Sequence, residues 1–312
     1  MHRANPLGEK EIVSENKAQR TFGYNITNIP IKIPLPRKAE PKLIDPIKVT
    51  IEEDPQKCAE YEKEIESFMR SIESKYMSKA NYMIKQPDIN EKMRAILIDW
   101  MVEVHLKFKL GENTLFSSVN IADRFLESQI VSRQKLQLVG VTAMFIASKY
   151  EEIYPPEIKD FVYICDNAYT KEEIISMEQI ILKVLNFTLN LPSSYRFLQY
   201  FSRKLNPGSK TYNMSLYLIE LSLIEYKFLK HRPSLCAAAA LYLSNRLINK
   251  DFEWDSKVGE VIGYKEVSLK QCAKEFVSIM QAANECTLDA VRKKFALSEH
   301  MKVSNIRIGK RS

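Results

Sequence analysis

The amino-acid sequence predicts an all-α protein of two tandem five-helix domains, preceded by a separate N-terminal helix and a disordered tail. Three observations predict this fold. Glycine is scarce, at 8 of 312 residues, which suits helices with short loops better than strands with glycine turns. Apolar residues recur at helical spacing through most of the chain. The two halves of the chain also resemble each other.

The N-terminal region is dominated by proline. Six of the 13 prolines lie within residues 1–50, and that density leaves no helical or strand period, so we expect residues 1–55 to be a disordered tail. Residues 56–77 then carry apolar side chains at helical spacing, beginning with Tyr61 and Ile65. This segment is expected to form an amphipathic helix that precedes the first domain.

Two series of helices follow, separated at Pro192. The expected helices of the first series are 91–109, 113–128, 133–150, 156–165 and 171–185. Those of the second are 194–204, 210–229, 234–249, 256–262 and 266–284. Asp88 with Glu91, and Thr170 with Glu173, have the spacing of capping boxes. We therefore expect domains at 56–190, which includes the N-terminal helix, and 191–298, followed by a basic tail at 299–312.

The two series are related by an internal repeat. A shift of 97 positions aligns Gly140–Lys149 with Ala237–Arg246, and the same ungapped shift aligns Thr114–Leu126 with Thr211–Leu223. One amphipathic helix can match another by chance, but two helices match here at a single shift. In each copy small residues precede large apolar ones, as expected of a central helix that its neighbours approach closely.

The net charge of +7 is concentrated in the termini. Residues 1–50 carry nine Lys or Arg against five acids, and residues 292–312 carry seven against one, which leaves residues 51–291 at −3. The folded part is therefore not a basic body, and we expect no nucleic-acid partner. No apolar run reaches the roughly 18–20 residues of a membrane span, so no membrane association is expected either.

The sequence shows no sign of catalysis, cofactor or metal binding. The five cysteines and four histidines are scattered, which disfavours a disulfide framework or zinc site and indicates a reducing compartment. No phosphate-binding glycine loop, H-E-x-x-H zinc motif or protein-kinase signature is present. We therefore expect a protein that is not an enzyme and has no cofactor.

The most informative segment is MRAILIDWMVEVH, residues 93–105. Its apolar residues at helical spacing, from Met93 to Val104, would ordinarily be buried core. The opposite face is apolar as well, so the helix either is central or offers one side to a partner. Asp99 and Glu103, spaced i and i+4, would then place two acids beside an exposed strip.

This segment closely resembles the "MRAIL" helix of the A- and B-type mitotic cyclins. The resemblance continues through TLFSSVNIADRFL, VSRQKLQLVGVTAMFIASKYEEIYPPEIKDFVYICDNAYT and MEQIILKVLNFTL, and covers roughly residues 56–298. It implies two tandem cyclin boxes and a regulatory subunit that binds and activates a cyclin-dependent kinase at G2/M. Features of both subtypes are present, so the sequence does not choose between A and B.

The resemblance implies a kinase-binding surface on the first box. Lys149 and Glu178 match the polar residues that grip the kinase αC helix. An intramolecular salt bridge, worth about 0–1 kcal/mol if exposed, is the alternative interpretation of this pair. The remaining implied kinase contacts are apolar or aromatic: Leu182, Phe187, Leu189, Tyr61 and Ile65.

The resemblance also implies a substrate-docking patch that binds R-x-L motifs of substrates and inhibitors. In such a patch apolar pockets take the Leu, while Glu103, helped by Asp99, pairs with the basic residue. The residues that match this patch are Met93, Ile96, Leu97, Trp100, Glu103, Leu136 and Gln137. Arg94 and Asp123 match a pair that ties the first two helices of the box together, a structural role.

The tail contains a partial match to the mitotic destruction box. Arg20, Ile26 and Asn28 fit the pattern, but Gly23 replaces its usual leucine. Ubiquitin ligase machinery is thus an expected partner, and nucleus and cytoplasm are the expected locations. The main alternative is a transcription-factor-type cyclin-fold module that contacts DNA, for which a zinc ribbon and a basic second repeat would be required.

Overall fold

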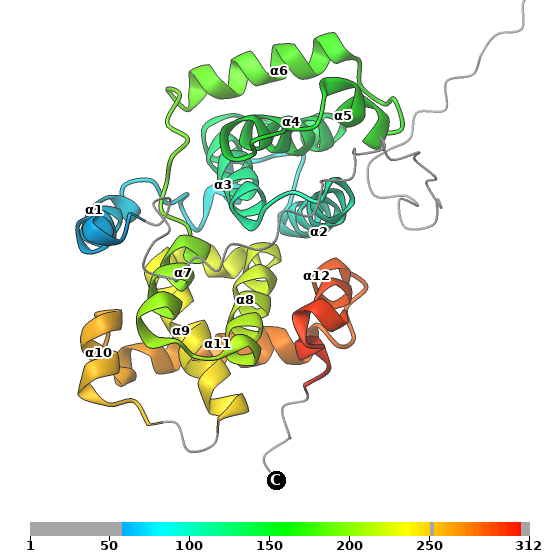
Figure 1. The fold of residues 1–312 in the computed structure, drawn as a ribbon. Helices are drawn as coiled ribbons and strands as arrows, with labels where there is room; N and C mark the ends of the chain where they lie inside the picture. The colour runs from blue at the N-terminus through cyan, green and yellow to red at the C-terminus, as the bar shows by residue number, and fades with distance from the viewer. Residues whose placement is uncertain (1–57, 250–252, 307–312) are drawn as a thin grey trace, which may run out of the picture.

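The computed structural model describes residues 58–249 and 253–306, and within them all regular secondary structure is helical (Figure 1). The first domain holds α2 (Glu91–Phe108), α3 (Glu112–Ser128), α4 (Arg133–Glu151), α5 (Ile158–Ile164) and α6 (Lys171–Val184). The second holds α7 (Ser194–Leu205), α8 (Ser209–Ile224), α9 (Pro233–Ile248), α10 (Ser256–Ile262) and α11 (Glu266–Ala282). Outside these bundles lie α1 (Glu62–Glu73) and α12 (Ala290–Lys294).

These elements confirm the predicted fold class and place the ten helices of the two series within a few residues of expectation, with one exception. The predicted helix 210–229 ends at Ile224, because Glu225 adopts an extended conformation before a 3₁₀ turn at Tyr226–Lys230. The short helix α12 was not predicted. Its five residues carry too little periodicity to be recognised in a sequence.

One of the two predicted capping boxes forms. The Thr170 hydroxyl accepts from the Glu173 N–H, and the Glu173 carboxylate accepts from the Thr170 N–H. The predicted box at Asp88 was wrong, because the N-cap of α2 is Asn90, whose side chain accepts from the Met93 N–H at 3.0 Å. Asp88 instead accepts from the backbone N–H and the Nε of Arg133, both at 2.8 Å.

The sequence repeat appears as a structural repeat. In the first domain α4 packs against α3 and α6, and in the second α9 packs against α8, α7 and α11. Buried hydroxyls recur at the shift of 97 positions, since Ser118 donates to the Thr114 carbonyl and Ser215 to the Thr211 carbonyl. Both central helices are apolar on nearly every side because each is surrounded by its own bundle.

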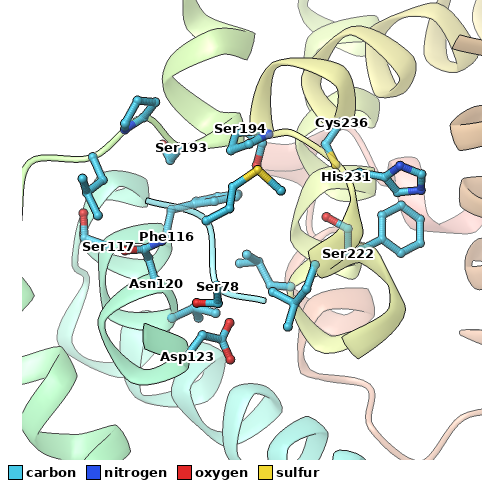
Figure 2. Close-up of a pocket in the computed structure, with 18 of the residues that line it drawn as sticks. Ser78, Phe116, Ser117, Asn120, Asp123, Ser193, Ser194, Ser222, His231 and Cys236 are labelled. Carbon is cyan, nitrogen blue, oxygen red and sulfur yellow. The ribbon is translucent and has the colours of Figure 1, made fainter. Parts of the chain in front are cut away.

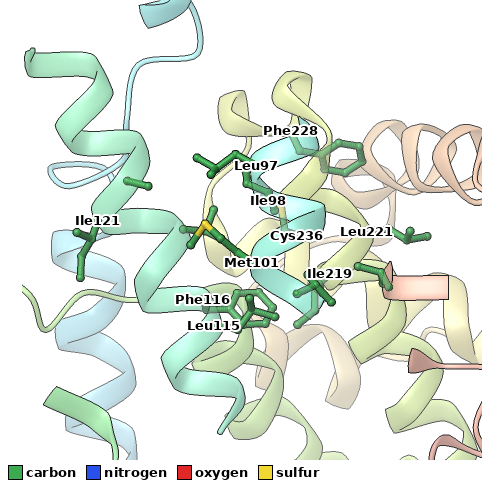
Figure 3. Packing of buried hydrophobic residues seen from close by; sticks show 14 of the residues in the cluster. Leu97, Ile98, Met101, Leu115, Phe116, Ile121, Ile219, Leu221, Phe228 and Cys236 are labelled. Atoms are coloured by element: carbon green, nitrogen blue, oxygen red, sulfur yellow. The ribbon is translucent and has the colours of Figure 1, made fainter. Parts of the chain in front are cut away.

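The two bundles share one apolar core. Helix α2 of the first domain lies against α8 and α12 of the second. Figure 3 shows Leu97, Ile98 and Met101 of α2 between residues of α3 and residues of α8 such as Ile219. Because the core is continuous, packing between the domains fixes their relative orientation, and the linker does not.

Gly140 lets α4 approach α2 closely. A Cβ at this position would lie 2.6 Å from Leu97 Cδ1 and 3.1 Å from its Cγ. We expect Gly140→Ala to lower the free energy of unfolding by about 1–3 kcal/mol through overpacking, measured by urea denaturation. Gly259→Ala in α10, where the nearest atom is 3.6 Å away, is the control and should be neutral or stabilising by up to about 1 kcal/mol. Equal effects of both substitutions would contradict this account.

Candidate protein-interaction sites

Lys149 and Glu178 form an ion pair on the surface of the first domain. Lys149 lies near the end of α4 and Glu178 in the middle of α6, and the Lys149 ammonium also lies 4.2 Å from the centre of the Phe145 ring. The Lys149 side chain is 42% exposed and that of Glu178 14%. Because Lys149 is open to solvent, the pair is partly solvated. Solvated ion pairs contribute only about 0–1 kcal/mol, so an incoming partner can replace this one at little cost.

Exposed apolar side chains flank this ion pair along the chain. Tyr150 follows Lys149 directly, and Ile153 and Tyr154, in the loop between α4 and α5, are 85% and 91% exposed. Ile180, two residues after Glu178, is 44% exposed. Large apolar residues concentrated around a polar pair are typical of a protein-interaction surface. Sequence reasoning missed these four residues, although Tyr150, Ile153 and Tyr154 lie in the KYEEIYPP segment and Ile180 lies in the MEQIILKVLNFTL segment, both of which carried the resemblance.

The predicted apolar kinase contacts differ in their exposure. Phe187 is 68% exposed and holds a left-handed backbone with φ of 53°, which is unusual for a bulky residue. Leu182 and Leu189 are half-buried against the core. Phe187 is thus free to contact a partner, whereas Leu182 and Leu189 also serve the packing of this domain.

Helix α1 carries a second exposed apolar stripe. Tyr61, Ile65 and Phe68 are 57%, 43% and 62% exposed, and their spacing of four and three residues places them on one face. Tyr61 and Ile65 were predicted to contact the kinase, and Phe68 extends the stripe by one turn. The described part of the chain leaves this stripe exposed to solvent.

The predicted docking patch divides into a buried floor and a half-exposed rim. Leu97, Trp100 and Leu136 are 1%, 7% and 0% exposed, so they support the patch from below. Met93, Ile96 and Gln137 are half-buried, and Glu103 is exposed. The structure therefore brings α2 and the start of α4 together as expected, with Met93 and Ile96 as its accessible apolar side chains.

Asp99 was expected to stand exposed beside Glu103, and this expectation was wrong. Asp99 is buried, and its carboxylate accepts from the Ala290 N–H at 3.0 Å. Burial raises its pKa to about 6, opposed by that hydrogen bond and reinforced by the nearby Glu103 carboxylate. Asp99 therefore holds α12 against α2, which leaves Glu103 as the acid available to a basic ligand.

Arg94 and Asp123 form a buried bidentate ion pair. Arg94 Nε and Nη2 donate to the two Asp123 oxygens at 2.6 and 2.7 Å, and the Tyr82 hydroxyl donates to Asp123 at 2.8 Å. Arg94 Nη1 also donates to the carbonyls of Leu223 and Ile224 at the end of α8. The pair thus joins α2 to α3, its predicted role, and in addition joins the first domain to the second.

A second buried charge cluster closes the other side of the domain junction. Lys294 of α12 is 2% exposed and donates to Glu112 at 2.9 Å and to Glu220 at 2.7 Å. Burial raises the pKa of Glu220 well above its usual value. The Lys294 ammonium also lies 3.3 Å from His105 Nε2. Glu220 is the repeat counterpart of Asp123, so a buried acid recurs at the same position of the two domains, and each acid pairs with a cation from a different element.

A small crevice opens between the two domains (Figure 2). Its volume is about 120 Å³, and its lining includes Ser78, Phe116, Asn120 and Ser222. That volume is below the roughly 300 Å³ of an ordinary ligand pocket. Among the residues that the structure describes, no group of three metal-binding side chains is clustered, and no helix has the length and apolarity of a membrane span.

The predicted destruction box at Arg20, Ile26 and Asn28 lies outside the described residues. The predicted tail at 1–55 and residues 307–312 of the predicted basic tail at 299–312 are outside them as well. The first part of that basic tail is not free, because Val303 and Ser304 lie in a buried 3₁₀ turn. The described part of the chain offers three candidate interaction surfaces: the Lys149–Glu178 region, the exposed stripe of α1 and the α2–α4 patch.

Comparison with known families agrees with this architecture. The model for the cyclin N-terminal domain matches residues 64–190, and that for the cyclin C-terminal domain matches residues 192–308. Among solved structures, a viral cyclin from herpesvirus saimiri superposes with a TM-score of 0.62 at 20% identity, covering 68% of this chain and 95% of that one. These matches define a helical protein of the tandem cyclin-box class.

The chain belongs to the cyclin family. It is 45% identical over 254 residues to the G2/mitotic-specific cyclin-B of Marthasterias glacialis, covering 81% of this chain and 65% of that relative. It is also 45% identical over 246 residues to human cyclin-A1, covering 78% of this chain and 53% of the relative. The chain thus spans about two thirds or less of the length of these relatives, and it matches both subtypes equally.

The buried cluster predicts a pH dependence of stability. Burial and the neighbouring Lys294 lower the pKa of His105 to about 4, against about 6.5 in an unfolded chain. The unfolded chain therefore takes up a proton at His105 more readily than the folded chain does. The free energy of unfolding is unaffected by this difference above about pH 6.5, and it decreases as the pH falls from about 6.5 towards 4. Between pH 7 and pH 5 the wild type should lose about 2 kcal/mol more unfolding free energy than His105→Gln.

Chemical denaturation of both proteins across this pH range measures the difference. Gln can still accept a hydrogen bond from Lys294, which makes the variant a conservative one. Identical pH profiles for the two proteins would show that His105 is not held neutral in the folded state.

Proposed function

We propose that this cyclin is a non-catalytic regulatory subunit that binds and activates a cyclin-dependent Ser/Thr kinase at G2/M. The observation that carries the proposal is the partly exposed Lys149–Glu178 pair, which is flanked by exposed apolar residues. The chain's similarity to a mitotic cyclin-B and to a cyclin-A1 supports the proposal. No reaction by the chain itself is required.

The chemistry of the surface fits a helix from the kinase. Lys149 can donate to backbone carbonyls and Glu178 can accept from backbone N–H groups that such a helix leaves free at its end. Ile153, Tyr154 and Phe187 supply the apolar area. Holding the kinase αC helix inward would let the kinase form its catalytic Lys–Glu pair, which raises activity without any group of the cyclin touching the substrate.

We further propose that the α2–α4 patch recruits R-x-L substrates and inhibitors. Met93 and Ile96 would contact the apolar residue of the motif, and Glu103 the basic residue. A docked substrate is tethered beside the kinase, so its effective concentration rises and its apparent KM falls. We also propose that the protein is present in both nucleus and cytoplasm. Ubiquitin ligase machinery would direct its degradation through the partial destruction box.

Swapping the two charges tests the kinase surface. Lys149→Glu/Glu178→Lys can keep its own ion pair, and hence its fold, but it presents reversed charges to the kinase. We expect the Kd for a monomeric cyclin-dependent kinase to rise by about 100-fold or more, with loss of histone phosphorylation at equal concentration.

The second domain offers a matched control. Arg246, at the shift of 97 from Lys149, pairs with Glu266 at 3.1 Å and lies over the Tyr242 ring. Arg246→Glu/Glu266→Arg should bind and activate the kinase as the wild type does. Full activation by the Lys149/Glu178 swap would refute the proposed grip.

Trimming the rim of the patch tests docking. Because Leu97 and Leu136 are core residues, the informative change is Met93→Ala/Ile96→Ala. It should raise the KM for a substrate containing an R-x-L motif by about tenfold, and leave a short peptide without the motif unaffected. Val267→Ala/Leu297→Ala, which removes exposed apolar groups of the second domain, is the control. Equal losses on both substrates would indicate a structural role for Met93 and Ile96.

A further inference from the structure

Helix α1 precedes the first domain in sequence but lies on the second (Figure 1). Glu62 at its start pairs with Arg203 and Lys204 of α7, both at 2.5 Å. Arg70 in its last turn donates to the carbonyl of Ile262 at the end of α10, at 2.6 Å. These bonds span the full length of α1, so the helix is held at both ends.

Glu73 supplies the most buried of these contacts. It is 3% exposed, and its two oxygens accept from the backbone N–H of Ser234 at 3.0 Å and from the Ser234 hydroxyl at 2.8 Å. Ser234 is the second residue of α9 and also lies 2.7 Å from the Tyr264 hydroxyl. A carboxylate at the N-terminus of a helix satisfies N–H groups that have no partner within the helix and interacts favourably with its dipole.

Arg70 fills an aromatic recess of the second domain. Its guanidinium lies 5.3–5.8 Å from the centres of three rings, those of Phe197, Phe201 and Tyr264. Gly263 leaves room for it, since a Cβ there would lie 3.2 Å from Arg70 Cζ. Stacking of a guanidinium on aromatic faces is stronger at a partly desolvated site such as this one.

The internal repeat shows where on the second domain this recess lies. The shift of 97 positions places Phe197 on Trp100 and Ser234 on Gln137. Trp100 and Gln137 are both members of the predicted docking patch of the first domain. Helix α1 therefore covers, on the second domain, the place that the docking patch occupies on the first. It does so with an arginine that is followed two positions later by an apolar residue, Ile72.

We propose that α1 is an intramolecular docking helix, which fills the second domain's counterpart of the docking patch so that its exposed stripe faces the kinase. Arg70 and Glu73 are positioning residues, because they contact the second domain and act on the kinase only through the placement of Tyr61, Ile65 and Phe68. The last step rests on the function proposed above. A helix fixed before binding has less conformational entropy to lose when it contacts the kinase.

The test uses Glu73→Gln in the full chain. The amide NH₂ cannot accept from Ser234, so we expect the backbone amides of α1 to exchange hydrogen at least tenfold faster. The amides of α8, and those of α9 beyond its first turn, should be unchanged. The Kd for a monomeric cyclin-dependent kinase should rise about tenfold, while kinase activity at saturating cyclin equals that of the wild type. Glu64→Gln, an exposed acid of the same helix, is the control and should change neither quantity.

Two outcomes would overturn the proposal. Unchanged exchange in α1 would show that Glu73 does not hold the helix, and faster exchange with an unchanged Kd would show that the placement of α1 does not serve kinase binding. If Glu73→Gln loosens the whole chain, Arg70→Gln is measured in the same way. A wild-type chain that binds no kinase would refute the proposed function, while the exchange measurement would still test the docking of α1.

Discussion

The buried ion pair of Arg94 and Asp123 is the constraint on which the rest of the structure depends. Arg94 is 1% exposed and places its guanidinium where α2, α3 and the end of α8 meet. Burial alone would lower the pKa of Arg94, but the Asp123 carboxylate raises it above its usual value. A buried charge is tolerated only when it is paired, and loss of one partner typically costs about 3–5 kcal/mol. The pair therefore fixes the orientation of the two domains.

That fixed orientation connects the two interaction surfaces. Helix α2 carries the proposed docking patch on one side and contacts α8 and α12 on the other. Lys294 and Asp99 add polar contacts from α12 to the same helix and its neighbours. A surface held in this way loses little entropy on binding, which suits the proposed role of a subunit that reshapes its partner. The partly exposed pair of Lys149 and Glu178 fits that role.

The sequence predicted most of the fold because strong helical periodicity and a repeat at one shift are local signals. It could not predict contacts between distant segments. Lys294 belongs to a basic run, Arg292–Lys294, that reads as a solvated tail, yet it is buried against Glu112 and Glu220. Asp99 was likewise predicted to be exposed. It is buried because α12, a short helix with almost no signal in the sequence, covers it. The sequence predicted which residues make up the patch. It did not predict which of them are buried, such as Leu97, and which are accessible, such as Met93.

The central claim is that this cyclin offers a preformed surface to a kinase. A structure of the chain bound to a monomeric cyclin-dependent kinase tests it most directly. We predict that Lys149 and Glu178 exchange their mutual ion pair for contacts to the kinase αC region, while the two domains keep the arrangement seen here. A kinase seated elsewhere on the chain, or domains that rotate apart at the Arg94–Asp123 junction on binding, would contradict the account.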